Sequence, residues 1–255
     1  MEKKAIKRAV AFDLDGTLIK GLRYSWTIVF KAVGVNEEEP AKLKKDFECG
    51  RISYPEWCEA DCRLLRENKL TFQKLQKAVK ESKVSLTKNL EPAILKLKDN
   101  GCKVAIISGG ADSVLYALLP NADELFDAIY INKLIYNRET GILEDIIPTK
   151  YDWDESKKGL EGKQAGFKYF CVQNGVKPEN SVFVGDDFND LGAMGIAGMK
   201  IFYHSYSQRE LDRGTLGRPD IKNLPFDVIY DSRNDLMGVA NRIVNWDFTD
   251  LKSRG

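Results

Sequence analysis

The residues most able to do chemistry in this sequence lie in one short stretch near its start. Asp13 and Asp15 directly follow an apolar run, Ala9–Phe12, which predicts a strand buried on both faces. Because side chains alternate along a strand, the two carboxylates leave its end on the same side. Two carboxylates this close repel each other, so a cation or a shared proton is expected between them. Gly16 then supplies a turn, and Thr17 can offer its hydroxyl group and its N–H to an anion.

Two further apolar runs also end in polar residues. The run Val104–Ile107 is followed by Ser108 and Gly109, where a turn can offer backbone N–H groups to an anion. A second run, residues 181–184, leads into an acidic segment that contains Asp186, Asp187 and Asp190. In an open parallel sheet the carboxyl ends of the strands share one edge, so these groups can converge there. Several carboxylates without histidine or cysteine favour a hard cation, Mg²⁺ before Zn²⁺.

The order of predicted elements indicates the fold class. From about residue 85 onward strands alternate with helices, which predicts an α/β fold with a doubly wound, Rossmann-like parallel sheet. Between residues 21 and 84 apolar residues fall at helical spacing, and Ser53 and Glu56 form a capping box at the start of one helix. We therefore expect a core domain of residues 1–20 and 85–255 and a smaller all-helical domain of residues 21–84, inserted after the first strand.

Composition argues against several classes of function. Lys and Arg number 39 against 38 Asp and Glu, a net charge of +1, so no single-sign field favours a nucleic-acid or anionic-membrane partner. No apolar run approaches the roughly 20 residues that span a bilayer, and no signal peptide precedes the first strand. Five scattered cysteines fit a reducing compartment. We expect a cytoplasmic protein, while its oligomeric state and the role of the polar stretches 147–159 and 205–223 stay open.

The stretch from Val10 to Leu18 resembles the first motif of the haloacid-dehalogenase-like (HAD) superfamily, and three later features follow in that family's order and spacing. The resemblance is to the phosphoserine-phosphatase-like branch, in which a helical cap occupies the position of the predicted insert. It implies a phosphomonoester hydrolase that needs Mg²⁺, forms an aspartyl-phosphate and acts on a small phosphorylated metabolite.

The same resemblance implies a role for each matching residue. Asp13 is expected to be the nucleophile and Asp15 the general acid and base. Lys163 matches the third-motif lysine because it lies 23 positions before Asp186, as in phosphoserine-phosphatase-like members; Lys157 and Lys158 are competing candidates. The implied phosphate ligands are Thr17, Ser108, Gly109, Lys163 and Asn189. The implied metal ligands are Asp13, Asp15, Asp186 and Asp190, with Asp187 left open.

The positions that would recognise the leaving group depart from phosphoserine phosphatase. Counting along the motifs places Leu22 where that enzyme pairs the serine ammonium, and Glu59 where it pairs the serine carboxylate. Since neither residue fits serine, we expect a different phosphate ester. Residues that could recognise it are Arg23, Arg51 or Arg63 as a cation, and Trp26, Tyr54 and Trp57 as pocket walls, unless these aromatics form the core of the cap.

Three alternatives remain open. The first is a phosphomutase that acts on a sugar phosphate with the same core. The second is phosphoserine phosphatase itself, if the alignment of the cap shifts by a residue or two. The third is a binding or regulatory module on an inherited fold, which the complete catalytic set argues against. A dehalogenase is disfavoured because that branch lacks the metal carboxylates.

Overall fold

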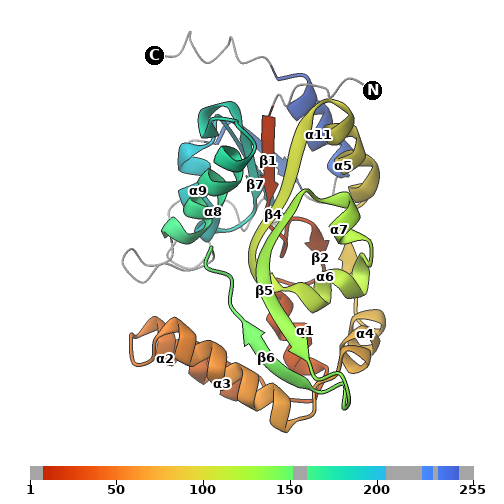
Figure 1. Ribbon diagram of the computed structural model, residues 1–255, viewed down its shortest axis with the longest axis vertical. Helices are drawn as coiled ribbons and strands as arrows, with labels where there is room; N and C mark the ends of the chain where they lie inside the picture. The colour runs from red at the N-terminus through yellow and green to blue at the C-terminus, as the bar shows by residue number, and fades with distance from the viewer. Residues whose placement is uncertain (1–7, 152–159, 205–225, 232–234, 247–255) are drawn as a thin grey trace.

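The computed structural model of the protein describes residues 8–151, 160–204, 226–231 and 235–246. Within them, a seven-stranded sheet has the order β6-β5-β4-β1-β7-β8-β9 (Figure 1). All neighbouring pairs are parallel except β5 and β6. The strands are β1 (Arg8–Phe12), β4 (Cys102–Ala111), β5 (Ala128–Tyr136), β6 (Leu143–Ile147), β7 (Val182–Gly185), β8 (Met199–His204) and β9 (Val228–Asp231).

Strand β1 lies in the middle of the sheet, between β4 and β7, and all of its residues are buried. Val10 and Phe12 pack into one hydrophobic core, and Ala9 and Ala11 pack into a second core on the opposite face. The uninterrupted apolar run is therefore the consequence of a strand that is covered on both sides.

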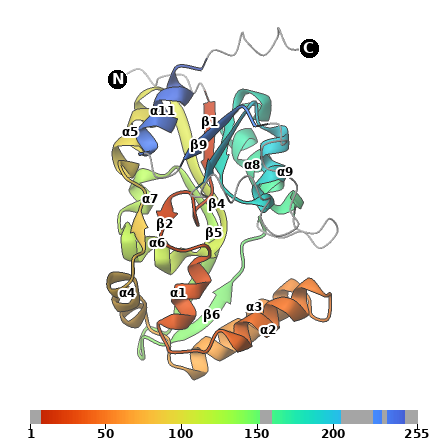
Figure 2. The same cartoon turned by 180° about the vertical axis from the view of Figure 1, so that it is seen from behind.

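Helices cover both faces of the sheet. One face carries α5 (Leu90–Asp99), α6 (Asp112–Leu118), α7 (Ala122–Leu125) and α11 (Leu236–Val244), and the other carries α8 (Leu160–Gln173) and α9 (Leu191–Ile196). Figure 2 shows α5 and α11 side by side on one side of the sheet, with α8 and α9 on the other. The predicted α/β fold with a doubly wound sheet is confirmed.

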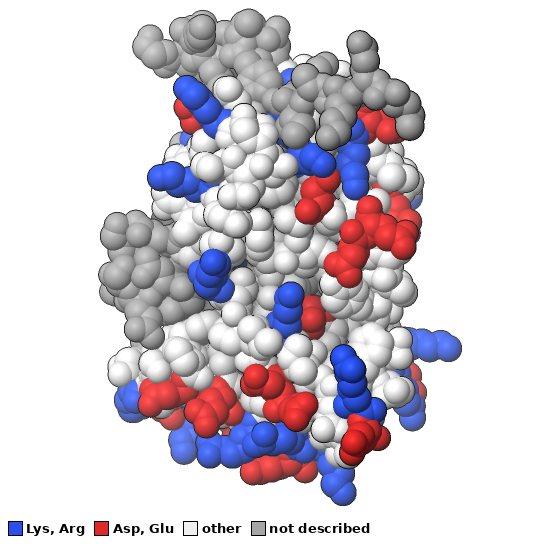
Figure 3. Space-filling view, viewed as in Figure 1, with Lys and Arg blue, Asp and Glu red and all other residues white. Residues whose placement is uncertain are grey.

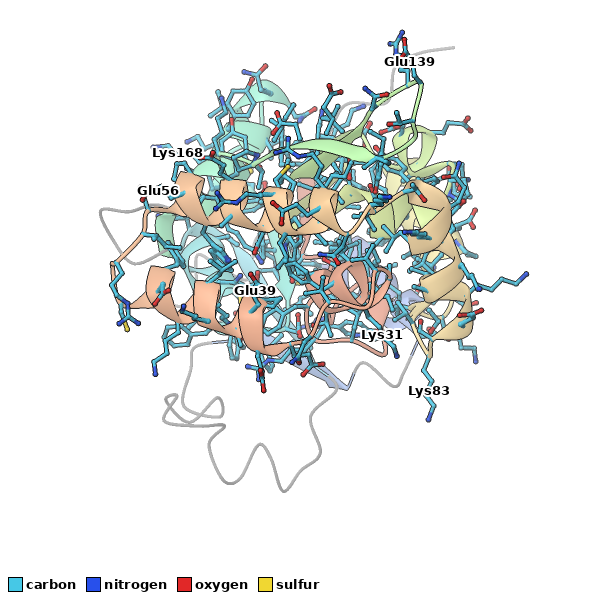
Figure 4. All side chains as sticks on the ribbon, turned by 90° about the horizontal axis from the view of Figure 1, so that it is seen from below. Lys31, Glu39, Glu56, Lys83, Glu139 and Lys168 are labelled. Carbon is cyan, nitrogen blue, oxygen red and sulfur yellow. The ribbon has the colours of Figure 1, made fainter. Side chains whose placement is uncertain are left out.

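A run of helices follows β1 and lies below the carboxyl ends of the parallel strands in Figure 1. These helices are α1 (Ser25–Lys31), α2 (Glu38–Glu48), α3 (Tyr54–Glu67) and α4 (Phe72–Glu81). The short strands β2 (Ile19–Lys20) and β3 (Ser85–Leu86) pair antiparallel where the chain leaves and re-enters the core. Helices α2 and α3 lie side by side (Figure 4). This is the inserted helical unit that the sequence predicts; its boundaries at residues 21 and 84 stay a prediction.

The start of α3 shows why this segment is helical. The Ser53 side chain accepts a hydrogen bond from the Glu56 N–H, and the Ser53 N–H donates to Glu56 Oε2 at 2.7 Å, which is the predicted capping box. Two of the N–H groups that lack partners at a helix start are thereby satisfied.

An antiparallel strand, β6, lies at one edge of the sheet beside β5. Residues 143–147 form β6, which pairs with β5 and contacts α3, and the Cys62 thiol lies 3.6 Å from the Glu144 carbonyl oxygen. Because β6 is short and carries Glu144 and Asp145, its alternation is too weak to identify a strand from sequence. The β5–β6 hairpin thus reaches from the sheet to the inserted helices. Residues 152–159 and 205–223 of the unassigned polar stretches lie outside the described residues.

The surface bears both signs of charge. Figure 3 shows acidic and basic side chains intermixed at the end of the molecule formed by α2 and α3. No helix in the described ranges is both long and apolar enough to span a membrane.

Candidate active site

Three carboxylates converge at the carboxyl ends of neighbouring strands. Asp13 follows β1, and Asp186 and Asp190 follow β7, its parallel neighbour. One oxygen atom of each lies within 4.8 Å of the others, so the three side chains could hold a metal ion together. Asp13 and Asp190 are buried, and Asp186 is half-buried. The convergence that the strand ends predict is therefore present in the fold.

Lys163 reaches this cluster from α8. Its side chain is 1 % exposed, and its Nζ lies 2.8 Å from Asp13 Oδ1 and 2.7 Å from Asp190 Oδ1. A buried ammonium is tolerated only when it is paired and hydrogen-bonded, and here two carboxylates do both. The competing candidates Lys157 and Lys158 lie outside the described residues.

Lys163 bonds two of the three carboxylates, but its single charge does not balance them all, so a further cation would stabilise the cluster. Burial raises the pKa of Asp186 well above its ordinary value; the neighbouring Asp13 and Asp190 raise it further, and the Lys20 ammonium opposes the rise. Burial also raises the pKa of Asp190, while the Lys163 ammonium opposes that rise. A set of carboxylate oxygens without nitrogen or sulfur suits a hard divalent cation, which would relieve this repulsion.

Asp15 lies beside the cluster but outside it. Its Oδ2 accepts hydrogen bonds from the Ser25 N–H at 2.7 Å and the Ser25 hydroxyl at 2.8 Å, whereas its buried Oδ1 has no partner within the described ranges. Burial raises the pKa of Asp15 to about 7; Ser25 opposes that rise and Asp13 adds to it. The arrangement thus suits an acid–base role for the Asp15 side chain, and its role as a metal ligand stays a prediction.

Ser25 was missed by sequence reasoning. It is the first residue of α1, it is buried, and its hydroxyl also accepts from the Ala111 N–H at 2.9 Å. A serine at the start of a predicted helix is an ordinary feature, so no local signal marks its contact with a carboxylate ten positions earlier.

A cavity of about 690 Å³ opens between the strand ends and the inserted helices. Its wall contains the predicted phosphate ligands Ser108, Gly109, Lys163 and Asn189, together with Asp13, Asp15, Asp186 and Asp187. The predicted turn at Ser108 is instead a continuation of β4, with a shift in its pairing to β5. The Gly109 carbonyl oxygen accepts from Trp26 Nε1 at 2.9 Å and Asn132 Nδ2 at 2.7 Å, which holds this segment in place.

Thr17 is the one predicted phosphate ligand that the structure does not bring to the cavity. Its side chain is buried and its hydroxyl donates to Asp186 Oδ1 at 3.1 Å. The chain turns at Gly16, whose φ is +78°, and a Cβ atom there would lie 2.0 Å from Asp186 Oδ2. The turn thus directs the Thr17 hydroxyl toward a carboxylate of the cluster, which it orients.

The inserted helices present a different set of side chains to the cavity than counting predicts. Leu22 packs against the hydrophobic core, and Glu59 lines a separate hollow between α3 and β6. The arguments from these two positions are therefore weakened. Leu22 lies before the start of α1, and at Glu59 on α3 a slip of one residue rotates the helix face by about 100°.

Of the three candidate arginines, only Arg23 lines the cavity; Arg51 pairs with Asp46 at 2.8 Å, and Arg63 lies in the separate hollow. All three candidate aromatics line it, namely Trp26, Tyr54 and Trp57.

Fold and site together define an α/β enzyme with a buried acidic cluster beneath a helical insert. The sequence model of the haloacid dehalogenase-like hydrolases matches residues 7–198, and the chain belongs to that family. It is similar to phosphoserine phosphatase of Methanocaldococcus jannaschii, with 29% identity over 203 residues that cover 80% of this chain and 87% of that protein. Phosphoserine phosphatase of Archaeoglobus fulgidus is 30% identical over 200 residues, or 78% of this chain and 53% of that protein.

A solved structure of a substrate-bound phosphoserine phosphatase complex superposes with a TM-score of 0.63 and 25% identity, over 92% of this chain and 97% of that one. The predicted family and its phosphoserine-phosphatase-like branch are thereby confirmed, and so is the prediction of a phosphatase.

Proposed function

We propose that this protein is a Mg²⁺-dependent phosphomonoester hydrolase that acts on a small phosphorylated metabolite through an aspartyl-phosphate on Asp13. The observation that carries the proposal is the buried Lys163 ammonium, hydrogen-bonded to both Asp13 and Asp190 at one end of the cavity. A carboxylate is a poor nucleophile toward a phosphate dianion unless positive charge offsets their repulsion. Lys163 supplies part of that charge at the attacking group itself.

A metal ion held by the acidic cluster would supply the remaining positive charge. Asp13, Asp186 and Asp190 would hold Mg²⁺, since they offer oxygen ligands alone. When bound, Mg²⁺ supplies stabilisation of the charge that develops on the phosphoryl oxygens.

The chain's own residues account for the proton transfers. A carboxylate oxygen of Asp13 attacks phosphorus, the bond to the ester oxygen breaks, and Asp15 gives its proton to the departing alkoxide. The Asp15 carboxylate then takes a proton from the water molecule that attacks the aspartyl-phosphate, which releases phosphate and restores Asp13. Ser108, Gly109 and Asn189 line the cavity and would bind the phosphate oxygens.

We further propose that phosphoserine is not the preferred substrate. The cavity volume of about 690 Å³ and its aromatic walls suit a leaving group larger or less charged than serine. Phosphoserine phosphatase itself is the second candidate, and the relatives that bear that name support it.

The test is the release of inorganic phosphate from a panel of phosphate esters, with Mg²⁺ or with a chelator. The panel contains phosphoserine, sugar and polyol phosphates, amino-alcohol phosphates and nucleotides. Wild type is compared with Asp13→Asn and with Glu124→Gln, which alters an exposed carboxylate on α7. We expect metal-dependent turnover that only Asp13→Asn abolishes.

Full activity of Asp13→Asn would contradict the proposed mechanism. An isomerised sugar phosphate with slow release of phosphate would favour the mutase, and phosphoserine as the best ester would favour the second candidate.

A further inference from the structure

One buried carboxylate at the cavity has no part in the proposed chemistry. Asp61 on α3 lines the cavity, is 7 % exposed, and its Oδ1 has no hydrogen-bond partner among the described residues. Burial raises the pKa of Asp61 to about 7, and no neighbouring charge is resolved that lowers it. A buried carboxyl group without a partner is costly, so its presence at a cavity wall requires an explanation.

A second unpaired polar group lies one helical turn earlier. The indole N–H of Trp57 is buried and has no acceptor in the described part of the chain. Residues four apart share one face of a helix, and Trp57 and Asp61 line the same cavity. A guest that suited both would place a positive charge at the carboxylate and an oxygen atom at the indole N–H.

Several aromatic side chains line the cavity that Asp61 also lines. The Trp57 ring stacks on Phe47 of α2 with 4.7 Å between ring centroids, and it meets Tyr54 edge-on at 6.0 Å, which fixes its orientation. Tyr24, Trp26 and Phe30 line the same cavity from the α1 side. A cavity wall that contains both a carboxylate and aromatic rings can bind organic cations such as ammonium groups.

Two of the cavity's own cations lie against the ring of Tyr24. Arg23 and Lys44 lie 5.3 and 4.7 Å from the centroid of the Tyr24 ring, and no described ion pair joins either of them to Asp61. The charged residues of the cavity outside the acidic cluster and its neighbours are Arg23, Lys31, Glu37, Lys44 and Asp61. A bound cation is therefore the simplest counter-charge for Asp61.

We propose that Asp61 and the aromatic walls bind a positively charged nitrogen on the leaving group, so that the substrates are phosphate monoesters of amino alcohols. The inference rests on the proposed phosphatase function and names the substrate class of that site. Asp61 is a specificity-determining residue here, because the reacting atoms lie at the acidic cluster.

The test compares two esters that differ in charge alone, phosphocholine and its neutral isostere 3,3-dimethylbutyl phosphate. For wild type we expect kcat/KM to favour phosphocholine about tenfold or more, as a cation paired with a carboxylate beside aromatic rings would give. Asp61→Asn keeps the shape of the side chain and should remove this preference, so that kcat/KM for phosphocholine falls to or below that for the neutral ester. Glu59→Gln, an exposed carboxylate on another face of α3, is the matched control and should keep the preference.

Two results would overturn the role of Asp61, and a third would overturn the substrate class. Equal kcat/KM for the two esters in wild type, or a preference that survives Asp61→Asn, overturns the inference. A preference for phosphoserine over phosphoethanolamine overturns the assignment to amino alcohols.

Turnover of neither ester would count against the phosphatase proposal rather than against Asp61. In that case the affinities of the two esters for the Asp13→Asn protein, measured by tryptophan fluorescence, would decide the inference. Equal affinities would overturn it, and tighter binding of phosphocholine that Asp61→Asn removes would uphold it.

Discussion

The buried lysine of the acidic cluster gives a prediction whose size follows from the structure. Lys163→Met keeps an unbranched chain of similar length and removes the ammonium that bonds Asp13 at 2.8 Å and Asp190 at 2.7 Å. Breaking a buried ion pair by removal of one partner costs about 3–5 kcal/mol, because a buried charge is left uncompensated. At about 2–4 °C per kcal/mol for a protein of this size, Tm should fall by roughly 6–20 °C in the absence of divalent metal.

The assay is thermal unfolding of wild type, Lys163→Met and Lys168→Met, each with chelator and with Mg²⁺. Lys168 lies on the same helix and is exposed (Figure 4), so its replacement is the control and should leave Tm unchanged. Because the cluster of the variant holds more unbalanced negative charge, Mg²⁺ should raise its Tm by more than it raises that of wild type. A metal-free Lys163→Met protein as stable as the control would refute the reasoning, and so would an equal effect of Mg²⁺ on all three proteins.

Three further predictions concern the neighbouring residues. Ser25→Ala removes one of the two hydrogen bonds that oppose the raised pKa of Asp15, so the pH profile of kcat should move to higher pH, which steady-state kinetics would detect. Gly16→Ala places a Cβ atom 2.0 Å from a carboxylate oxygen of the acidic cluster, so it should reduce the stabilisation of the protein by Mg²⁺. Gly141 also has a positive φ, +68°, but open space around it, so Gly141→Ala should lower the stability of the protein without changing the effect of Mg²⁺. Thermal unfolding of both variants with and without metal distinguishes these effects. Since Asp61 has a raised pKa of about 7 and pairs a cation only when ionised, KM for a cationic ester should rise as pH falls below about 7, and KM for a neutral ester should not follow it.

Much of the acidic cluster could be predicted from the sequence because strand ends in a parallel sheet share one edge. Asp13 and Asp186 lie at such ends, and Asp190 follows within one turn, so the topology brings them together. Lys163 was found only through the spacing of a family motif, since a lysine on a helix is ordinarily exposed. Its burial depends on where α8 lies against the sheet, which local sequence does not specify.

The inserted helices were predicted as helices, but the side chains that they present to the cavity were not. Rotation of a helix about its axis depends on tertiary packing, so Glu59 on α3 was assigned to a wall that it does not line. Leu22 lies in the segment before α1 and packs against the hydrophobic core, which counting along the motifs does not reveal. Asp61 attracted no notice because an acidic residue on a charged helix is ordinarily solvated. Ser25 was missed because its contacts with Asp15 and Ala111 join segments that no motif connects.

The most direct test of the account is chemical trapping of the phosphorylated enzyme. Wild-type protein is quenched during turnover of its best ester with Mg²⁺, the acyl phosphate is reduced with borohydride, and the peptides are analysed by mass spectrometry. The account predicts that residue 13 is converted from aspartate to homoserine, that the conversion requires both substrate and metal, and that Asp13→Asn shows none. Steady turnover with no conversion at residue 13, or with conversion at another carboxylate, would contradict the assignment of Asp13 as the nucleophile.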